Sequence, residues 1–340
     1  MTDLAPQYRE LCIHGLAMEL ACAVEGLLGP LDHYLRPFVV EALPEGFARS
    51  SGMIQAFDEA EVLRHLSSHA TRLPVADSWM QLYRDGERMW LVDERWGMAE
   101  LNFLRSQWQS WVLPRPTIHP LRLLEAAVLW PAAQLLRPRG LHLLPAASVA
   151  RDGWGVLIIC PFTIEPELEF PVGAGARLIG QRWTAARFDD GRVELLHMPG
   201  MVERSLPPRL RQPMLDCSEQ WVDVTADDPQ AIVNHGFCDF VLLVEPGRRT
   251  RAAVQELSRA EAQEALRFAW PILEVHPTRR SGALSCRLAQ TCRCAQVQLS
   301  RKPGDLMALI DSMIATAPAA APSLTLFTRQ PHRRAEAMPA

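Results

Sequence analysis

The residues with the strongest potential for chemistry follow an apolar run near the middle of the 340-residue chain. Gly155 to Cys160 (GVLIIC) is long enough for one buried strand, and Arg151-Asp152-Gly153 before it is typical of a tight turn. In nucleotide-binding α/β proteins, such a strand ends in a glycine-rich loop whose backbone N–H groups bind phosphate. The chemistry to look for after Cys160 is therefore phosphate binding.

The segment that follows (PFTIEPELE) lacks what phosphate binding needs. It contains neither glycine nor lysine, and its two prolines have no N–H to donate. Its glutamates place negative charge where an anion would have to bind, and close like charges repel by on the order of a few kcal/mol. The sequence therefore predicts a degenerate phosphate loop without a cofactor, at Cys160, Pro161, Glu165, Pro166 and Glu167.

The pattern around this strand resembles the HPr kinase/phosphorylase group, in particular the HPr kinase-related proteins of peptide-modification gene clusters. Residues 145–157 (PAASVARDGWGVL) follow the group's strand, turn and apolar strand until the loop begins. Pro145 stands where the group has a histidine, and Gln181 and Arg182 stand where it has paired aspartates. The resemblance covers roughly residues 120–313. It implies a nucleotide-binding core fold that has lost the residues of the chemistry.

A second group of reactive residue types lies near the C-terminus. Cys286, Cys292 and Cys294, with His276 nearby, could bind a metal or react with oxidants. Their C-x5-C-x-C spacing differs from the paired C-x2-C of zinc sites. Alternation along a strand starting at Cys294 would bury some of these thiols, so we interpret them as structural and reduced, with metal or redox work as the alternative. We predict no metal site.

Two further combinations invite a catalytic interpretation. Ser148, His142 and Asp152 are the residue types of a hydrolase triad, but no nucleophile-elbow motif surrounds the serine. Cys160 has no base near it in sequence, and the glutamates after it disfavour a thiolate. We therefore predict no catalytic residue.

Composition limits the class of partner. The net charge is −4 and the pI is about 6.2, whereas binding to nucleic acid or an anionic membrane calls for a basic excess. The most apolar N-terminal stretch, Leu11 to Leu31, carries His14, Glu19 and Glu25, which argues against a signal peptide or a membrane span. We expect a cytoplasmic protein with its eight cysteines reduced and with neither nucleic acid nor membrane as partner.

The length suggests about two domains. We expect a small N-terminal α+β module over 1–115, an HPr kinase-like core over 116–315, and a disordered Ala/Pro-rich tail over 316–340. The fold class is α/β or α+β. Tryptophan is frequent in the N-terminal module, where it would form either the core or a surface for a protein or peptide. The tryptophans in question are Trp79, Trp90, Trp96, Trp108 and Trp111.

Periodicity and turn signals place the elements that would position these residues. Helices are expected over 11–28, 57–68, 121–136 (bent at Pro131), 258–270 and 305–314. Strands are expected over 38–40, 80–83, 89–92, 98–104, 108–113, 155–160, 177–179, 183–188, 193–198, 221–225, 237–244 and 294–299.

Three functional interpretations follow. The favoured one is a catalytically inactive HPr kinase-like protein, a pseudokinase that binds a protein or peptide partner in a peptide-modification pathway. One alternative is an active kinase of such a pathway that transfers phosphate to a serine. Another is a small-molecule-binding protein that uses the former nucleotide cleft. The sequence does not identify the partner or the oligomeric state.

Overall fold

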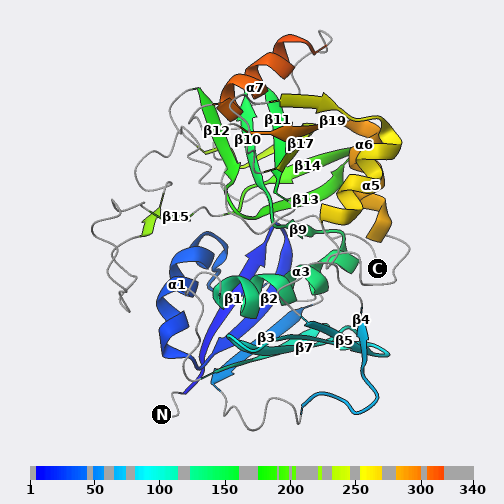
Figure 1. Ribbon diagram of the computed structural model, residues 1–340. Coiled ribbons are helices and arrows are strands. Elements are labelled where there is room, and N and C mark those ends of the chain that lie inside the picture. Colours follow the sequence, from blue (N-terminus) through cyan, green and yellow to red (C-terminus); the bar gives the residue numbers. More distant parts are fainter. Residues whose placement is uncertain are drawn as a thin grey trace, which may run out of the picture.

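The computed structural model describes most of the chain (Figure 1). The described residues are 5–43, 49–56, 65–73, 81–113, 123–160, 175–189, 191–198, 201–203, 221–223, 232–245, 253–269, 281–299 and 305–317. The residues after Cys160 that were expected to form the degenerate loop, the boundary expected near residue 115, and 318–340 of the expected tail lie outside them.

The N-terminal part forms a mixed eight-stranded sheet in the order β1-β2-β3-β8-β7-β6-β5-β4. β2, β3 and β8 run parallel to one another, and the other neighbours are antiparallel. The strands are β1 (Gln7–Ile13), β2 (Leu16–Cys22), β3 (Ser50–Ala56), β4 (Thr71–Leu73), β5 (Gln81–Asp85), β6 (Arg88–Asp93), β7 (Gly97–Asn102) and β8 (Gln107–Val112).

The rest of the chain forms a nine-stranded sheet in which β11, β17 and β19 run parallel at the centre. Its path is β12-β10-β11-β17-β14-β13-β9, and β19 and β18 continue from β17. The strands are β9 (His142–Leu144), β10 (Ala147–Arg151), β11 (Trp154–Ile159), β12 (Ala176–Gly180), β13 (Thr184–Asp189), β14 (Arg192–Leu196), β17 (His235–Glu245), β18 (Ala253–Glu256) and β19 (Arg293–Gln298). A separate two-stranded ribbon joins β15 (Met201–Glu203) to β16 (Trp221–Asp223).

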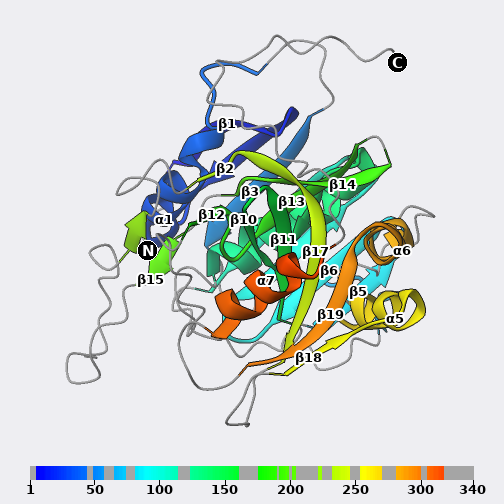
Figure 2. The ribbon, with the colours of Figure 1, turned by 90° about the horizontal axis from the view of Figure 1, so that it is seen from above.

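Helices cover these sheets in layers. Helix α1 (Glu25–Leu35) and helix α3 (Trp130–Leu136) lie on the first sheet (Figure 1). Helix α7 (Asp305–Ala315) packs on one face of the second sheet, while α5 (Arg259–Ala269) and α6 (Ser281–Thr291) pack on the other (Figure 2). The architecture is α+β, with two large sheets and few helices, in agreement with the expected class.

A proline explains how the central helix binds the first sheet. A π-helical turn, Glu125–Leu129, runs directly into α3, and Pro131 occupies the first turn of α3. Pro131 has no N–H to give to the carbonyl of Ala127, four residues earlier. That carbonyl instead accepts hydrogen bonds from Trp108 Nε1 at 3.2 Å and Ser110 Oγ at 2.7 Å, both on β8. The irregularity expected at Pro131 therefore anchors the helix to the sheet.

The helix expected over 11–28 is wrong. The chain forms the hairpin β1–β2 there, because His14 and Gly15 take up positive φ angles of 49° and 85° and turn it back. The helix begins only at Glu25 and runs through Pro30, where it had been expected to stop. The strand expected over 38–40 is a single 3-10 turn, Arg36–Phe38, followed by one bridge from Val39 to Leu11.

Most other local predictions are confirmed. The hairpins at 85–88, 151–154 and 189–192 form. The strands expected over 237–244 and 294–299 are present as β17 and β19. The capping box at the start of α5 is present, with Ser258 N donating to Glu261 Oε2 at 2.8 Å. The sequence reasoning missed α6 and β18, and residues 57–64 of the second expected helix lie outside the described residues.

The tryptophans of the first sheet belong to its core. Trp90 and Trp96 have no exposed surface, and Trp108 and Trp111 are also buried. The proposed tryptophan surface for a partner is therefore wrong for these four side chains, and Trp79 lies outside the described residues. Large aromatic side chains contribute most when both faces are packed, which is how the sheet and its helices hold them.

Candidate functional site

Strand register brings the predicted positions to one end of the second sheet. Ala147 of β10 lies opposite Ile158 of β11, two residues before Cys160, and the chain turns at Pro145, where Ala146 N donates to the carbonyl of Leu144 at 2.8 Å. Leu144 of β9 lies opposite Thr184 of β13, directly after the turn that contains Gln181 and Arg182. Pro145 is thus close to the Gln181–Arg182 turn, since Thr184 Oγ1 also donates to the carbonyl of Ala146 at 2.9 Å.

The thiol of Cys160 is unreactive in this environment. Its thiol is half-buried and donates a hydrogen bond to the carbonyl of Val244 at 3.4 Å. Burial raises the pKa of Cys160 to about 11, so the thiol is neutral at pH 7 and a poor nucleophile. The structure does not describe Pro161, Glu165, Pro166 or Glu167.

A carboxylate that sequence reasoning missed lies at the same end of the sheet, where the parallel strands β11 and β17 end. Glu245 ends the parallel strand β17, where α/β proteins tend to bind their ligands. Its carboxylate accepts hydrogen bonds from Gln296 Nε2 at 2.6 Å and Gln298 Nε2 at 3.5 Å, both on β19. A glutamate directly after a buried apolar run was the available signal. The end of β17 therefore carries a carboxylate that two side-chain amides hold in place.

The turn that contains Gln181 and Arg182 is a structural clamp. Arg182 Nε and Nη2 donate to the two carboxylate oxygens of Glu125 at 2.8 and 3.2 Å. Trp183 Nε1 donates to Glu125 Oε1 at 3.3 Å. The Glu125 side chain is 6% exposed and that of Arg182 is 24% exposed. This forked pair ties the β12–β13 turn to the π-helical turn on the first sheet.

Ser148, His142 and Asp152 make separate contacts. The Ser148 hydroxyl is buried and shares a 2.8 Å hydrogen bond with Thr184 Oγ1. Asp152 lies in the exposed turn after β10, 3.6 Å from Arg151. His142 is buried on β9 with its ring edge-on to Phe188. These contacts give no support to a hydrolase triad.

Burial of His142 makes stability depend on pH. Desolvation, aided by the charge of Arg137, lowers the pKa of His142 from 6.5 to about 4. The unfolded chain therefore binds a proton that the folded chain refuses, and stability is lost as pH falls below about 6.5. Between there and about pH 4, the free energy of unfolding of His142→Leu should fall less steeply than that of the wild type, by up to roughly 1.4 kcal/mol per pH unit.

Urea titrations of both proteins across this pH range give the measurement. His14 serves as a background group, because burial also lowers its pKa to about 4 and it is present in both proteins. Equal slopes for wild type and variant would contradict the assigned protonation of His142.

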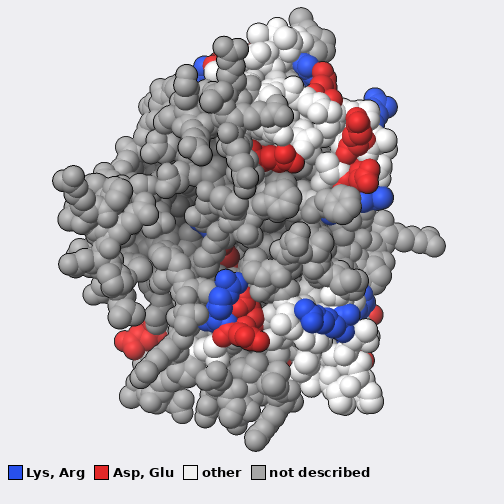
Figure 3. Space-filling model, viewed as in Figure 1, with Lys and Arg blue, Asp and Glu red and all other residues white. Residues whose placement is uncertain are grey.

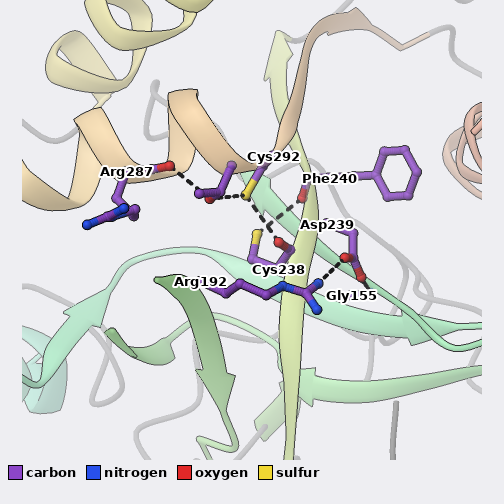
Figure 4. Close-up of polar contacts among 8 residues, drawn as sticks. Gly155, Arg192, Cys238, Asp239, Phe240, Arg287 and Cys292 are labelled. Atoms are coloured by element: carbon purple, nitrogen blue, oxygen red, sulfur yellow. Dashed lines mark hydrogen bonds and ion pairs between the residues drawn. The ribbon is translucent and has the colours of Figure 1, made fainter. Parts of the chain in front are cut away.

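The cysteines that lie together in the structure differ from the group expected from the sequence. Cys292 Sγ donates to the backbone carbonyl of Cys238 at 3.2 Å (Figure 4). Cys294 is buried on β19, with its sulfur 3.8 Å from the carbonyl of Cys292. Cys286 lies on α6, where its sulfur accepts a hydrogen bond from Gln290 Nε2 at 3.1 Å. Cys238, which is 54 residues from Cys292 in the chain, therefore takes the place expected for Cys286. No cluster of three or more metal-ligating side chains occurs among the described residues.

Charged side chains of both signs lie next to each other on the described part of the face shown in Figure 3. Among the described helices, none combines the length and hydrophobicity that crossing a bilayer needs. The predictions of no nucleic-acid partner, no membrane partner and a cytoplasmic location stay predictions.

No protein-family model matches the chain, and no curated protein sequence matches it. Among solved structures, it is similar to the HPr(Ser) kinase/phosphatase from Coxiella burnetii, with 11% sequence identity and a TM-score of 0.30. The similarity covers 51% of this chain and 88% of the kinase/phosphatase. A likeness of this strength bears on neither activity nor partners.

Proposed function

We propose that this chain is an HPr kinase-like protein that does not transfer phosphate and that acts by binding a protein or peptide, as an accessory factor of a peptide-modification pathway. The kinship rests on the sequence pattern of residues 145–157, and the pathway rests on that same resemblance. Two features of the described residues support the proposal. One concerns the chemistry and the other concerns the partner.

The Arg182–Glu125 pair carries the argument against phosphoryl transfer. Enzymatic phosphoryl transfer needs metal ions to bridge the phosphates and neutralise developing charge. At the position where the resemblance expects carboxylates for this purpose, the chain has the guanidinium of Arg182, already committed to Glu125 at 2.8 Å. A guanidinium at this place supplies no oxygen ligand for Mg²⁺, and the carboxylate beside it, Glu125, is engaged by Arg182 and by the indole of Trp183.

We predict no measurable binding of ATP or GTP in the presence of magnesium. Isothermal calorimetry on the full chain is the measurement, and a parallel titration with EDTA identifies heat that does not depend on the metal. A magnesium-dependent dissociation constant in the micromolar range would contradict the proposal and favour the active serine kinase.

A sheet edge offers a place for the partner. Among the described strands, β18 pairs only with β19, and its side chains point largely into solvent. Leu257 N donates inward to the carbonyl of Cys294, so by alternation the N–H groups of Val254 and Glu256 point away from the sheet. The Val254 side chain is 41% exposed beside them. An outward row of this kind pairs with an extended peptide.

Proline at Val254 tests this edge. Val254→Pro removes an outward N–H and leaves the inward hydrogen bonds to β19 in place, while Val254→Ala removes the side chain and keeps the N–H. Peptides selected on the wild-type chain from a display library should bind Val254→Pro at least about tenfold more weakly, since a tenfold loss equals about 1.4 kcal/mol. Their affinity for Val254→Ala should change much less.

Equal affinity of the selected peptides for wild type and Val254→Pro would show that β18 is not the binding edge. Circular dichroism of both variants is the control for folding. The nucleotide titration does not depend on β18, so the two halves of the proposal fail separately.

A further inference from the structure

The second sheet holds a pair of thiols that the proposed function does not use. Cys238 lies near the start of β17, and Cys292 lies between α6 and β19, the parallel neighbour of β17. Cys292 Sγ donates to the carbonyl of Cys238 at 3.2 Å, Cys238 Sγ contacts the carbonyl of Phe240 at 3.5 Å, and Figure 4 shows the two cysteine side chains next to each other. We propose that Cys238 and Cys292 form a reversible disulfide when the protein meets a hydroperoxide.

A bulge in β17 produces this arrangement. Gly155 of β11 pairs with Cys238, but the next residue, Val156, pairs with Phe240, so Asp239 is an extra residue in β17. The bulge reverses the alternation, and Cys238 joins the core on the face that packs on α5 and α6, while Phe240 faces α7. Without it, Cys238 would point to the side opposite Cys292.

Asp239 holds the bulge in place. Its carboxylate accepts a hydrogen bond from the backbone N–H of Gly155 at 3.0 Å (Figure 4). It also forms an ion pair with Arg192 Nη2 at 2.6 Å. The Asp239 side chain is mostly buried, and it joins three neighbouring strands, β11, β14 and β17. The position of the Cys238 thiol is therefore fixed by the fold before any oxidant arrives.

The exposure of the two thiols indicates which cysteine is oxidised first. Cys292 is half-buried, while Cys238 and Cys294 are buried, so Cys292 meets the oxidant first. Its sulfur attacks the hydroperoxide, an S–O bond forms, the O–O bond breaks, and water or an alcohol leaves. The Cys238 sulfur then attacks the Cys292 sulfur, the S–S bond forms, the S–O bond breaks, and the oxygen leaves as water with the Cys238 proton.

The environment of Cys238 makes the second step slow at neutral pH. Burial first, and then the neighbouring Cys292 thiol, raise the pKa of Cys238 well above its usual range. Because the thiolate is the attacking species, closure of the disulfide should become faster as pH rises. The sulfenic acid on Cys292 should therefore persist longer at lower pH.

The test uses the reduced full chain, treated with hydrogen peroxide and then alkylated before peptide mapping by mass spectrometry. We expect a linked peptide pair that contains Cys238 and Cys292, reversed by dithiothreitol. Cys292→Ser should abolish it, and Cys286→Ser, a change to another partly exposed thiol on α6, should leave it intact. In Cys238→Ala, dimedone should label Cys292, because the sulfenic acid then has no partner.

Several outcomes would overturn the proposal. They are linkage of Cys292 to Cys294, over-oxidation of Cys292 without any linked peptide, and linkage that survives in Cys292→Ser. If Cys238→Ala fails to fold, the pH dependence of closure in the wild type decides, since closure that is independent of pH would exclude the buried thiol as the attacking group.

Discussion

Replacing Glu125 by alanine is expected to lower the free energy of unfolding by about 3–5 kcal/mol, which is the usual cost of removing one partner from a buried ion pair. Glu125 accepts hydrogen bonds from Arg182 and from the buried indole of Trp183. Its loss leaves a guanidinium that is 24% exposed and an indole N–H without this acceptor. Urea denaturation followed by circular dichroism measures the change.

The pair between Arg49 and Glu19 is the matched control. It has a similar length of 2.6 Å, but its side chains are 41% and 43% exposed. Glu19→Ala should therefore cost no more than about 1 kcal/mol. A loss for Glu125→Ala as small as that for Glu19→Ala would show that the Arg182 turn is not a clamp, which would reopen this turn as a binding site.

Adding a methyl group at Gly155 is expected to cost about 2–4 kcal/mol of stability, in the upper range for overpacked interiors. A Cβ on this residue would lie 2.0 Å from the backbone carbonyl oxygen of Phe237. The obstacle is backbone of the central strand β17, which cannot move aside as a flexible side chain can. Gly155→Ala must therefore separate β11 from β17 at the bulge.

Gly86→Ala distinguishes this clash from the general loss of a glycine. Gly86 lies in the β5–β6 turn at φ +55° with no atom within 4 Å of an added Cβ, so only the left-handed backbone is penalised, by roughly 1–2 kcal/mol. If Gly155→Ala costs no more than Gly86→Ala, the strands are less tightly paired at the bulge than described. In that case the placement of Cys238 also needs revision.

Gly155→Ala and the thiol pair depend on one feature, the fixed centre of the second sheet. Asp239 binds Gly155 N and Arg192, and the bulge at Asp239 turns Cys238 toward Cys292. Gly155→Ala should therefore also reduce disulfide formation between the two cysteines. Glu125→Ala acts at the other contact, between the sheets, and should affect that reaction less.

The sequence by itself determined the local elements with strong short-range signals. Asp85-Gly86 and Arg151-Asp152-Gly153 marked hairpin turns, since glycine takes up positive φ without strain. The long apolar run at 237–244 marked the central strand, and Ser258 with Glu261 marked the start of α5. The absence of glycine and lysine from residues 161–169 is likewise a property of the sequence alone.

Tertiary structure decided what depends on residues far apart in the chain. The stretch 11–28 has apolar residues at helical spacing, yet the positive φ of His14 and pairing within the first sheet made it a hairpin. Helical propensity is weak compared with burial in a sheet, so the sheet prevailed.

The candidate site also combines features that the sequence shows with features that only the folded chain shows. That the turn carries Gln181 and Arg182 and no carboxylate is readable in the sequence, but the ion pair of Arg182 with Glu125, 57 residues earlier, is not. Likewise, a one-residue bulge turns Cys238 toward Cys292, because one inserted residue reverses which side chains face a given side of a strand. Register and charge pairing over such distances arise only when the chain has folded.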